Sequence, residues 1–121
     1  MAKVVSWNAR GLCNLDSQGS VSMLLKKTKA NVILIQETKI KESGGIDDAK
    51  LFPKEWKWVC VPSIGLSGGM VLAWNPCDII MKDSFVGTFS ISIVCTISCL
   101  NVDCFIIGVY GPCDKRLSME F

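Results

Sequence analysis

The segment from Asn31 to Lys39 constrains the fold of this chain most strongly. Positions 32–35 are four consecutive branched apolar residues, and Gln36 and Glu37 follow at once. The run is too short for a helix of normal length, and its lack of alternation predicts a strand buried on both faces. Glu37 is the first acid after this strand. An acid there is held rigidly and still meets solvent, as a metal ligand or general base requires.

A second stretch, residues 3–8, is built in the same way. It is a short apolar run that ends in Asn8 and is followed by Gly11, which marks a turn. One helix-sized segment separates the two stretches. If a helix joins two neighbouring parallel strands, both strand ends lie at one edge of the sheet. We therefore expect Asn8 and Glu37 to come together.

Length and charge bound the function. With 121 residues, half of them apolar, residues 1–121 fit one globular domain. The formal charge of +2 is too small to argue for nucleic acid by electrostatics alone, so DNA binding must be argued from the site. The chain contains no histidine, which excludes any mechanism that needs an imidazole base from this chain alone.

The cysteines indicate an intracellular, reducing compartment. There are seven, without a C-x-x-C pair, and the absence of histidine leaves no common zinc pattern. An odd and scattered set suggests buried thiols. The N-terminus lacks the apolar region of a signal peptide, so no secretion is indicated, and the nucleus stays open as a location without a clear targeting signal.

Residues 89–109 are apolar enough, and the segment is long enough, to suggest a membrane-spanning segment. Asn101 and Asp103 interrupt them, and apolar positions alternate with Ser90, Ser92 and other small polar residues. This alternation favours a β-hairpin over a membrane helix, so we expect no membrane partner. One face of residues 89–99 should pack and the other should face solvent.

Further elements follow from the apolar pattern. Asp16 or Ser17 should begin a helix whose apolar residues include Val21 and Leu24, with lysines 26, 27 and 29 in its last turn as a solvated face. We expect strands over residues 58–61, 70–74, 78–85 and 104–110. Gly68 and Gly69 are interpreted as a tight turn or close backbone approach rather than a phosphate nest.

Residues 39–57 are polar and irregular, with a short helix expected near 48–52. Phe52, Trp56 and Trp58 either pack this excursion onto the sheet, which we prefer, or stack nucleic-acid bases.

Four motifs occur together in order. They are Trp7-Asn8-Ala9-Arg10-Gly11-Leu12, Gln36-Glu37-Thr38-Lys39, Ser67-Gly68-Gly69-Met70 running to Trp74, and Tyr110-Gly111-Pro112. Each motif alone is weak evidence for a family, whereas four motifs in the same order and approximate spacing are specific evidence. From about residue 3 to residue 113 the chain resembles the N-terminal half of an endonuclease/exonuclease/phosphatase domain, specifically the apurinic-type endonuclease of plant-type LINE (non-LTR) retrotransposons.

This resemblance implies an α/β fold, the first half of a DNase-I-like four-layer sandwich with two mixed β-sheets and helices outside. It implies hydrolysis of a DNA phosphodiester with Mg²⁺ or Mn²⁺ and no small-molecule cofactor. Asn8 resembles the amide that positions the phosphate and the metal, Glu37 the carboxylate ligand, and Tyr110 the phenol that hydrogen-bonds the scissile phosphate. Arg10 either contacts the DNA backbone or is a solvated turn residue; both interpretations stay open.

The family's later motifs, Asp-x-Asn, a further Asp and Ser-Asp-His, are absent from the eleven residues after Tyr110. Whether the chain is an enzyme is therefore left open. We expect a truncated domain that is inactive alone, with uncovered inner sheet faces and a tendency to aggregate. The alternatives are a non-catalytic half-domain with at most weak metal or nucleic-acid binding, and another phosphodiesterase or phosphatase of the superfamily. The oligomeric state is not indicated.

Overall fold

The computed structural model describes residues 2–41, 45–46, 50–63, 68–87 and 89–109. Its elements, in chain order, are β1 (Val4–Asn8), α1 (Leu15–Thr28), β2 (Val32–Gln36), β3 (Lys57–Val61), β4 (Met70–Trp74), β5 (Ile79–Val86), β6 (Ser90–Ile97) and β7 (Val102–Val109). Each strand expected from the sequence is present, with described ends within two residues of those expected. The helix expected near residues 48–52 falls partly outside the described residues.

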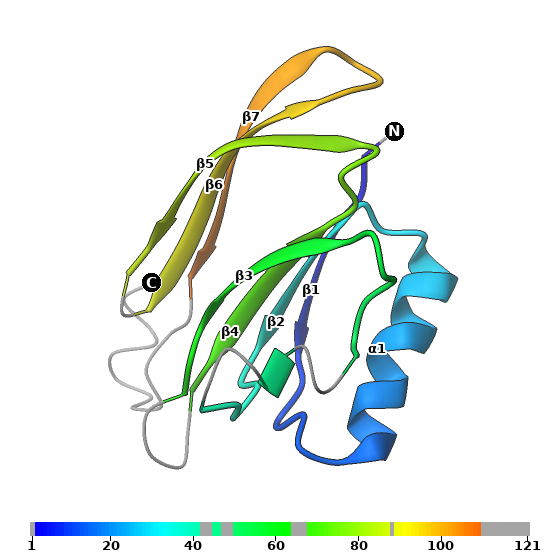
Figure 1. Ribbon diagram of the computed structural model, residues 1–121, viewed down its shortest axis with the longest axis vertical. Helices are drawn as coiled ribbons and strands as arrows, with labels where there is room; N and C mark the ends of the chain where they lie inside the picture. The colour runs from blue at the N-terminus through cyan, green and yellow to red at the C-terminus, as the bar shows by residue number, and fades with distance from the viewer. Residues whose placement is uncertain (1, 42–44, 47–49, 64–67, 88, 110–121) are drawn as a thin grey trace.

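The first sheet has the strand order β1-β2-β4-β3 and is mixed. β1 and β2 run parallel, whereas β4 runs antiparallel to both β2 and β3. Residues 32–35 of β2 and all of β4 are buried, because α1 covers one face of this sheet and a second sheet covers the other (Figure 1). The prediction of a strand buried on both faces is confirmed.

The second sheet has the order β5-β6-β7 and is antiparallel. The ladder between β5 and β6 shifts at a bulge between Met81 and Asp83. β6 and β7 form the hairpin that the alternating pattern predicts. No helix among the described residues is long and apolar enough to cross a membrane.

Two hydrophobic clusters hold the layers together. The cluster between α1, the loop after β2 and the first sheet consists of Leu12, Val21, Ile33, Ile35, Ile40, Ile46, Leu51, Val71 and Ala73. The cluster between the two sheets consists of Val32, Leu34, Met70, Leu72, Trp74, Ile79, Ile91, Ile93 and Cys95. Phe52, Trp56 and Trp58 pack against the first cluster, as the preferred interpretation of the loop predicted.

The N-cap of α1 differs from the prediction. Asn14, not Asp16 or Ser17, caps the helix, and its side-chain oxygen accepts a hydrogen bond from Ser17 N at 2.8 Å. Asn is as good a cap as Asp or Ser, so all three candidates fit the local sequence and only the backbone path separates them. Lys26 and Lys27 lie exposed in the last turn, where they complement the helix dipole as expected.

The outer face of the second sheet leaves large apolar side chains exposed: Ile80, Phe85, Phe105, Ile107 and Val109. We call this set the outer apolar face. The expectation of uncovered inner faces was therefore wrong for the centre of the interface, where the two sheets cover each other. Met81 and Val86, which pair with the inward-facing Cys95 and Ile91, remain exposed at its margin. The outer apolar face lies on the opposite side of the second sheet.

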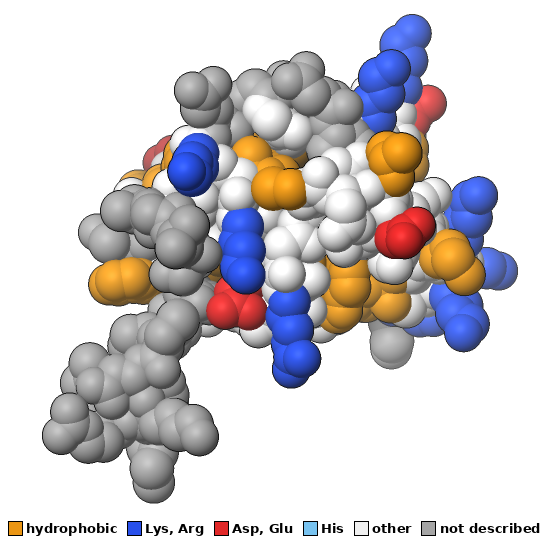
Figure 2. Space-filling model, turned by 90° about the horizontal axis from the view of Figure 1, so that it is seen from below, with side chains coloured by type: hydrophobic (Ala, Val, Ile, Leu, Met, Phe, Trp, Pro, Cys, Tyr) orange, Lys and Arg blue, Asp and Glu red, His pale blue; other side chains and the backbone are white. Residues whose placement is uncertain are grey.

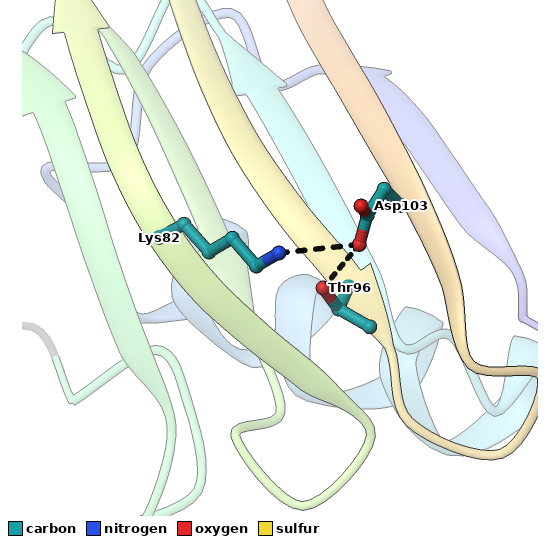
Figure 3. Close-up of polar contacts among 3 residues, drawn as sticks. All are labelled: Lys82, Thr96 and Asp103. Atoms are coloured by element: carbon teal, nitrogen blue, oxygen red, sulfur yellow. Dashed lines mark hydrogen bonds and ion pairs between the residues drawn. The ribbon is translucent and has the colours of Figure 1, made fainter.

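One polar cluster interrupts the outer apolar face (Figure 3). The Thr96 hydroxyl donates a hydrogen bond to Asp103 Oδ1 at 2.7 Å, and Lys82 Nζ lies 3.3 Å from the same oxygen. These interactions, with the hydroxyl first, lower the pKa of the Asp103 carboxyl from its ordinary value.

The expectation of buried thiols holds only in part. Cys95 is buried and Cys60 and Cys104 are half-buried, whereas Cys13, Cys77 and Cys99 are exposed. These six are free thiols. Burial raises the pKa of the Cys95 thiol, which favours its neutral form in the core.

Candidate active site

The candidate site lies where β1 and β2 end. Asn8 pairs with Gln36 in the parallel register, so both strands finish at the same edge. Beyond the strands the two segments stay hydrogen-bonded, since Ala9 N donates to Gln36 O at 2.9 Å and Gly11 N donates to Glu37 O at 2.7 Å. The expected meeting of these two strand ends is therefore present, at the lower edge of the sheet in Figure 1.

Asn8 is exposed and shapes the turn that follows it. Its Oδ1 accepts a hydrogen bond from Arg10 N at 3.1 Å, and Arg10 has a φ of 54°. Asn8 thus caps its own turn, which is the role it would have in any fold. A carbonyl oxygen has two lone pairs, so this bond leaves acceptor capacity for a further ligand.

Glu37 is half-buried and adopts a left-handed backbone with a φ of 54°. Two hydrogen bonds from the following residues fix this conformation: Thr38 N donates to Gly69 O at 3.2 Å, and Lys39 N donates to Gly68 O at 3.0 Å. A non-glycine residue with such a φ is held there by its surroundings. The chain therefore holds Glu37 between β1 on one side and the turn before β4 on the other.

The turn before β4 requires glycine. Gly69 has a φ of +89°, and a Cβ at this position would collide with the Thr38 hydroxyl and approach Lys39 N to 3.3 Å. Thr38 itself is only 1% exposed, so it has no room to move away. The structural interpretation of the glycine pair is confirmed: it permits a close backbone approach beside Glu37.

Tyr110 lies outside the described residues, but the residue before it is placed. Gln36 Nε2 donates to Val109 O at 2.9 Å, which joins the end of β2 to the end of β7. The two sheets also approach closely here, since a Cβ on Gly108 would come within 2.7 Å of the Leu34 side chain. Gln36 is not among the site residues expected from the sequence. Its position inside the Gln-Glu-Thr-Lys motif was the available signal.

The charges around the site are mostly positive. Arg10, Lys39 and Lys41 are exposed on the segments that flank Asn8 and Glu37. Figure 2, which looks onto this end of the molecule, shows basic side chains spread across the face, with hydrophobic and fewer acidic side chains between them. Such a face favours an anionic ligand such as a phosphate group.

The oxygen donors at this edge are few for a divalent cation. Within the described residues, no three acidic, cysteine or histidine side chains lie close enough to hold a metal by themselves. Mg²⁺, however, commonly uses one or two carboxylates, with waters and substrate phosphate as the remaining ligands. One carboxylate from Glu37 and one amide oxygen from Asn8 fit that pattern.

Comparisons with known proteins show the fold. No protein-family model and no curated protein matches the sequence. Among solved structures, D. rerio TDP2 complexed with a single-strand DNA product has a TM-score of 0.71 at 14% identity, covering 95% of this chain and 48% of that one. An AP endonuclease from Archaeoglobus fulgidus has a TM-score of 0.63 at 21% identity, covering 93% and 42%.

A mannosyl-6-phosphatase from Bacteroides thetaiotaomicron is also similar, with a TM-score of 0.71 at 9% identity, covering 97% of this chain and 54% of that one. The chain thus spans about half the length of these structures. Their names include an endonuclease and a phosphatase, so the likeness does not settle the substrate. What it shows is that this chain has the DNase-I-like α/β fold of the endonuclease/exonuclease/phosphatase structures.

Proposed function

We propose that the chain is the N-terminal half of a metal-dependent endonuclease domain that nicks DNA for retrotransposition. The observation that carries this proposal is the geometry of one sheet edge, where Asn8 ends β1 and Glu37 follows β2, its parallel neighbour. The fold, shared with AP endonucleases and TDP2, supports it. The Trp-Asn-x-Arg-Gly-Leu form of residues 7–12, which resembles the retrotransposon branch, supports the choice of DNA over other phosphodiesters.

Each residue at the edge has a role in this proposal. The Glu37 carboxylate and the Asn8 amide oxygen hold a Mg²⁺ or Mn²⁺ ion, which stabilises negative charge on a phosphodiester when it is bound. Tyr110, which follows Val109 directly, hydrogen-bonds the scissile phosphate. Arg10 and Lys39 attract the DNA backbone without sequence preference.

The 121 residues alone are proposed to be inactive. Their sequence offers no histidine and none of the family's later acidic motifs to activate water. Loss of a general base alone lowers a rate by roughly 10²–10⁴-fold. We propose that cutting requires the second half of the domain, whether from a longer product of the same gene or from another polypeptide.

A supercoiled-plasmid assay with Mg²⁺ tests the proposal. The 121-residue chain should leave the plasmid intact. The product encoded when reading continues past the codon for Phe121 should nick it, provided that Asp-x-Asn and Ser-Asp-His motifs follow. The matched variant Glu37→Gln should abolish nicking by that product, and nicking that persists unchanged would remove Glu37 from the mechanism.

A further inference from the structure

A cavity of about 360 Å³ opens beside the start of β3, away from the Asn8–Glu37 edge. Its described lining consists of residues 46, 50–54, 56 and 58. This segment packs on the same side of the first sheet as α1, because its aromatic residues and Val21 of α1 share one hydrophobic cluster. A cavity of this size lies within the range of small-ligand sites.

Aromatic rings form the wall of the cavity. The Phe52 and Trp56 rings are stacked, with centroids 6.1 Å apart and planes 10° from parallel, and Trp58 adds a third aromatic side chain. All three are half-buried, and Leu51 beneath them is buried. The rings are therefore fixed by the core while part of their surface remains accessible. A fixed, partly exposed aromatic surface suits a planar aromatic ligand.

Two cations accompany the rings. Lys50 and Lys54 line the cavity and are exposed. None of the described residues that line the cavity is acidic, since Glu55 is outside the lining. Packing of the loop explains the burial of the aromatic side chains but not the gathering of lysines around a hollow. A base-sized aromatic group joined to a phosphate satisfies both features, since the ring stacks and the phosphate meets the ammonium groups.

This cavity is separate from the candidate active site. Trp58 pairs with Ala73, which pairs with Ile33, and Ile33 lies three residues before Gln36 along β2. At about 3.3 Å per residue, the two positions differ by about 10 Å along the strand direction, and two strands lie between β3 and β1. A ligand here need not touch Asn8 or Glu37, so the inference does not depend on the proposed function.

We propose that this cavity binds a nucleotide, with the base on the Trp56 and Trp58 rings and the phosphate at Lys50 and Lys54. The bound nucleotide is either a free mononucleotide or one nucleotide of a single-stranded nucleic acid, since both contain an aromatic base joined to a phosphate.

The test uses the full chain and the indole N–H signals of its four tryptophans in NMR spectra, assigned by Trp→Phe variants. Titration with dAMP should shift the Trp56 and Trp58 signals in a saturable way. The signal of buried Trp74 should stay in place, which provides an internal control. Deoxyadenosine, which lacks the phosphate, should bind more weakly, and ribose 5-phosphate should leave the Trp56 signal unchanged.

The double variant Lys50→Gln/Lys54→Gln should raise the Kd for dAMP about 10-fold and leave that for deoxyadenosine unchanged. Lys26→Gln/Lys27→Gln removes the same charge from α1 and should change neither value. Tighter binding of an oligodeoxyadenosine than of dAMP would identify single-stranded nucleic acid as the ligand, and equal binding would identify the free nucleotide. Absence of a saturable shift at about 10 mM dAMP, or the same Kd for dAMP in the wild type and the Lys50/Lys54 variant, overturns the proposal.

Discussion

At the scale of residues, the geometry beside Glu37 depends on a glycine thirty-two positions further along the chain. Because Gly69 has no side chain, its backbone can approach Thr38 and Lys39 closely. Backbone hydrogen bonds from Thr38 N to Gly69 O and from Lys39 N to Gly68 O fix the two segments against each other. The sequence could place Asn8 and Glu37 at strand ends, because each is a polar residue that follows an apolar run. It could not supply the contact between Gly69 and Thr38, which exists only once β2 and β4 pair.

We predict that Gly69→Ala lowers the free energy of unfolding by about 1–3 kcal/mol, because the new residue must hold a positive φ and its Cβ meets Thr38. Urea unfolding measures the change. Gly19→Ala is the control: a Cβ at Gly19, within α1, would meet nothing within 4 Å, so this variant should gain about 1 kcal/mol from helix propensity. Equal effects of the two variants would refute the close-approach argument.

At the scale of elements, the strands followed from apolar runs and alternation, whereas details of pairing did not. Phe89 and Cys99 were expected on the packed face of the alternating segment, but β6 begins at Ser90 and ends at Ile97, and both residues are exposed. Periodicity identifies a face but not where the ladder stops. The bulge between Met81 and Asp83 likewise cannot be predicted from the apolar pattern of the sequence. Lys82, at this bulge, forms the ion pair with Asp103.

The Thr96–Asp103 pair predicts a pH-dependent contribution to stability. Because the folded state lowers the pKa of Asp103, this contribution is complete above the pKa of an unfolded Asp, about 3.9, and is lost as the pH falls through the folded value. Thr96→Val should therefore destabilise the chain more at pH 7 than at pH 2 in urea unfolding. The same substitution in an Asp103→Asn background should show no such pH dependence; a constant difference in both would contradict the assignment.

At the scale of the whole molecule, the fold class followed from the motifs and the strand pattern, and the position of the uncovered surface did not. The sequence suggested exposed inner faces, yet the cluster between the sheets buries the central residues of these faces. Which face of an amphipathic strand is covered depends on the element that packs against it. The alternation within one strand does not predict that element.

The outer apolar face predicts self-association, because exposed apolar side chains are gathered on one sheet face. Phe105→Ser/Ile107→Thr should lower the light scattering of the purified chain several-fold at equal concentration. Met23→Ser, which removes an exposed apolar side chain from α1, is the matched control and should leave scattering unchanged. Equal scattering by the wild type and the double variant would place the association elsewhere.

The central claim is that the edge formed by Asn8 and Glu37 is a divalent-metal site, and Mn²⁺ titration monitored by NMR tests it most directly. Paramagnetic Mn²⁺ should broaden the backbone amide signals of residues 8–11 and 36–39 first, and Glu37→Gln should abolish that broadening while Asp83→Asn leaves it unchanged. Broadening centred on another carboxylate, or broadening at residues 36–39 that survives Glu37→Gln, would contradict the account.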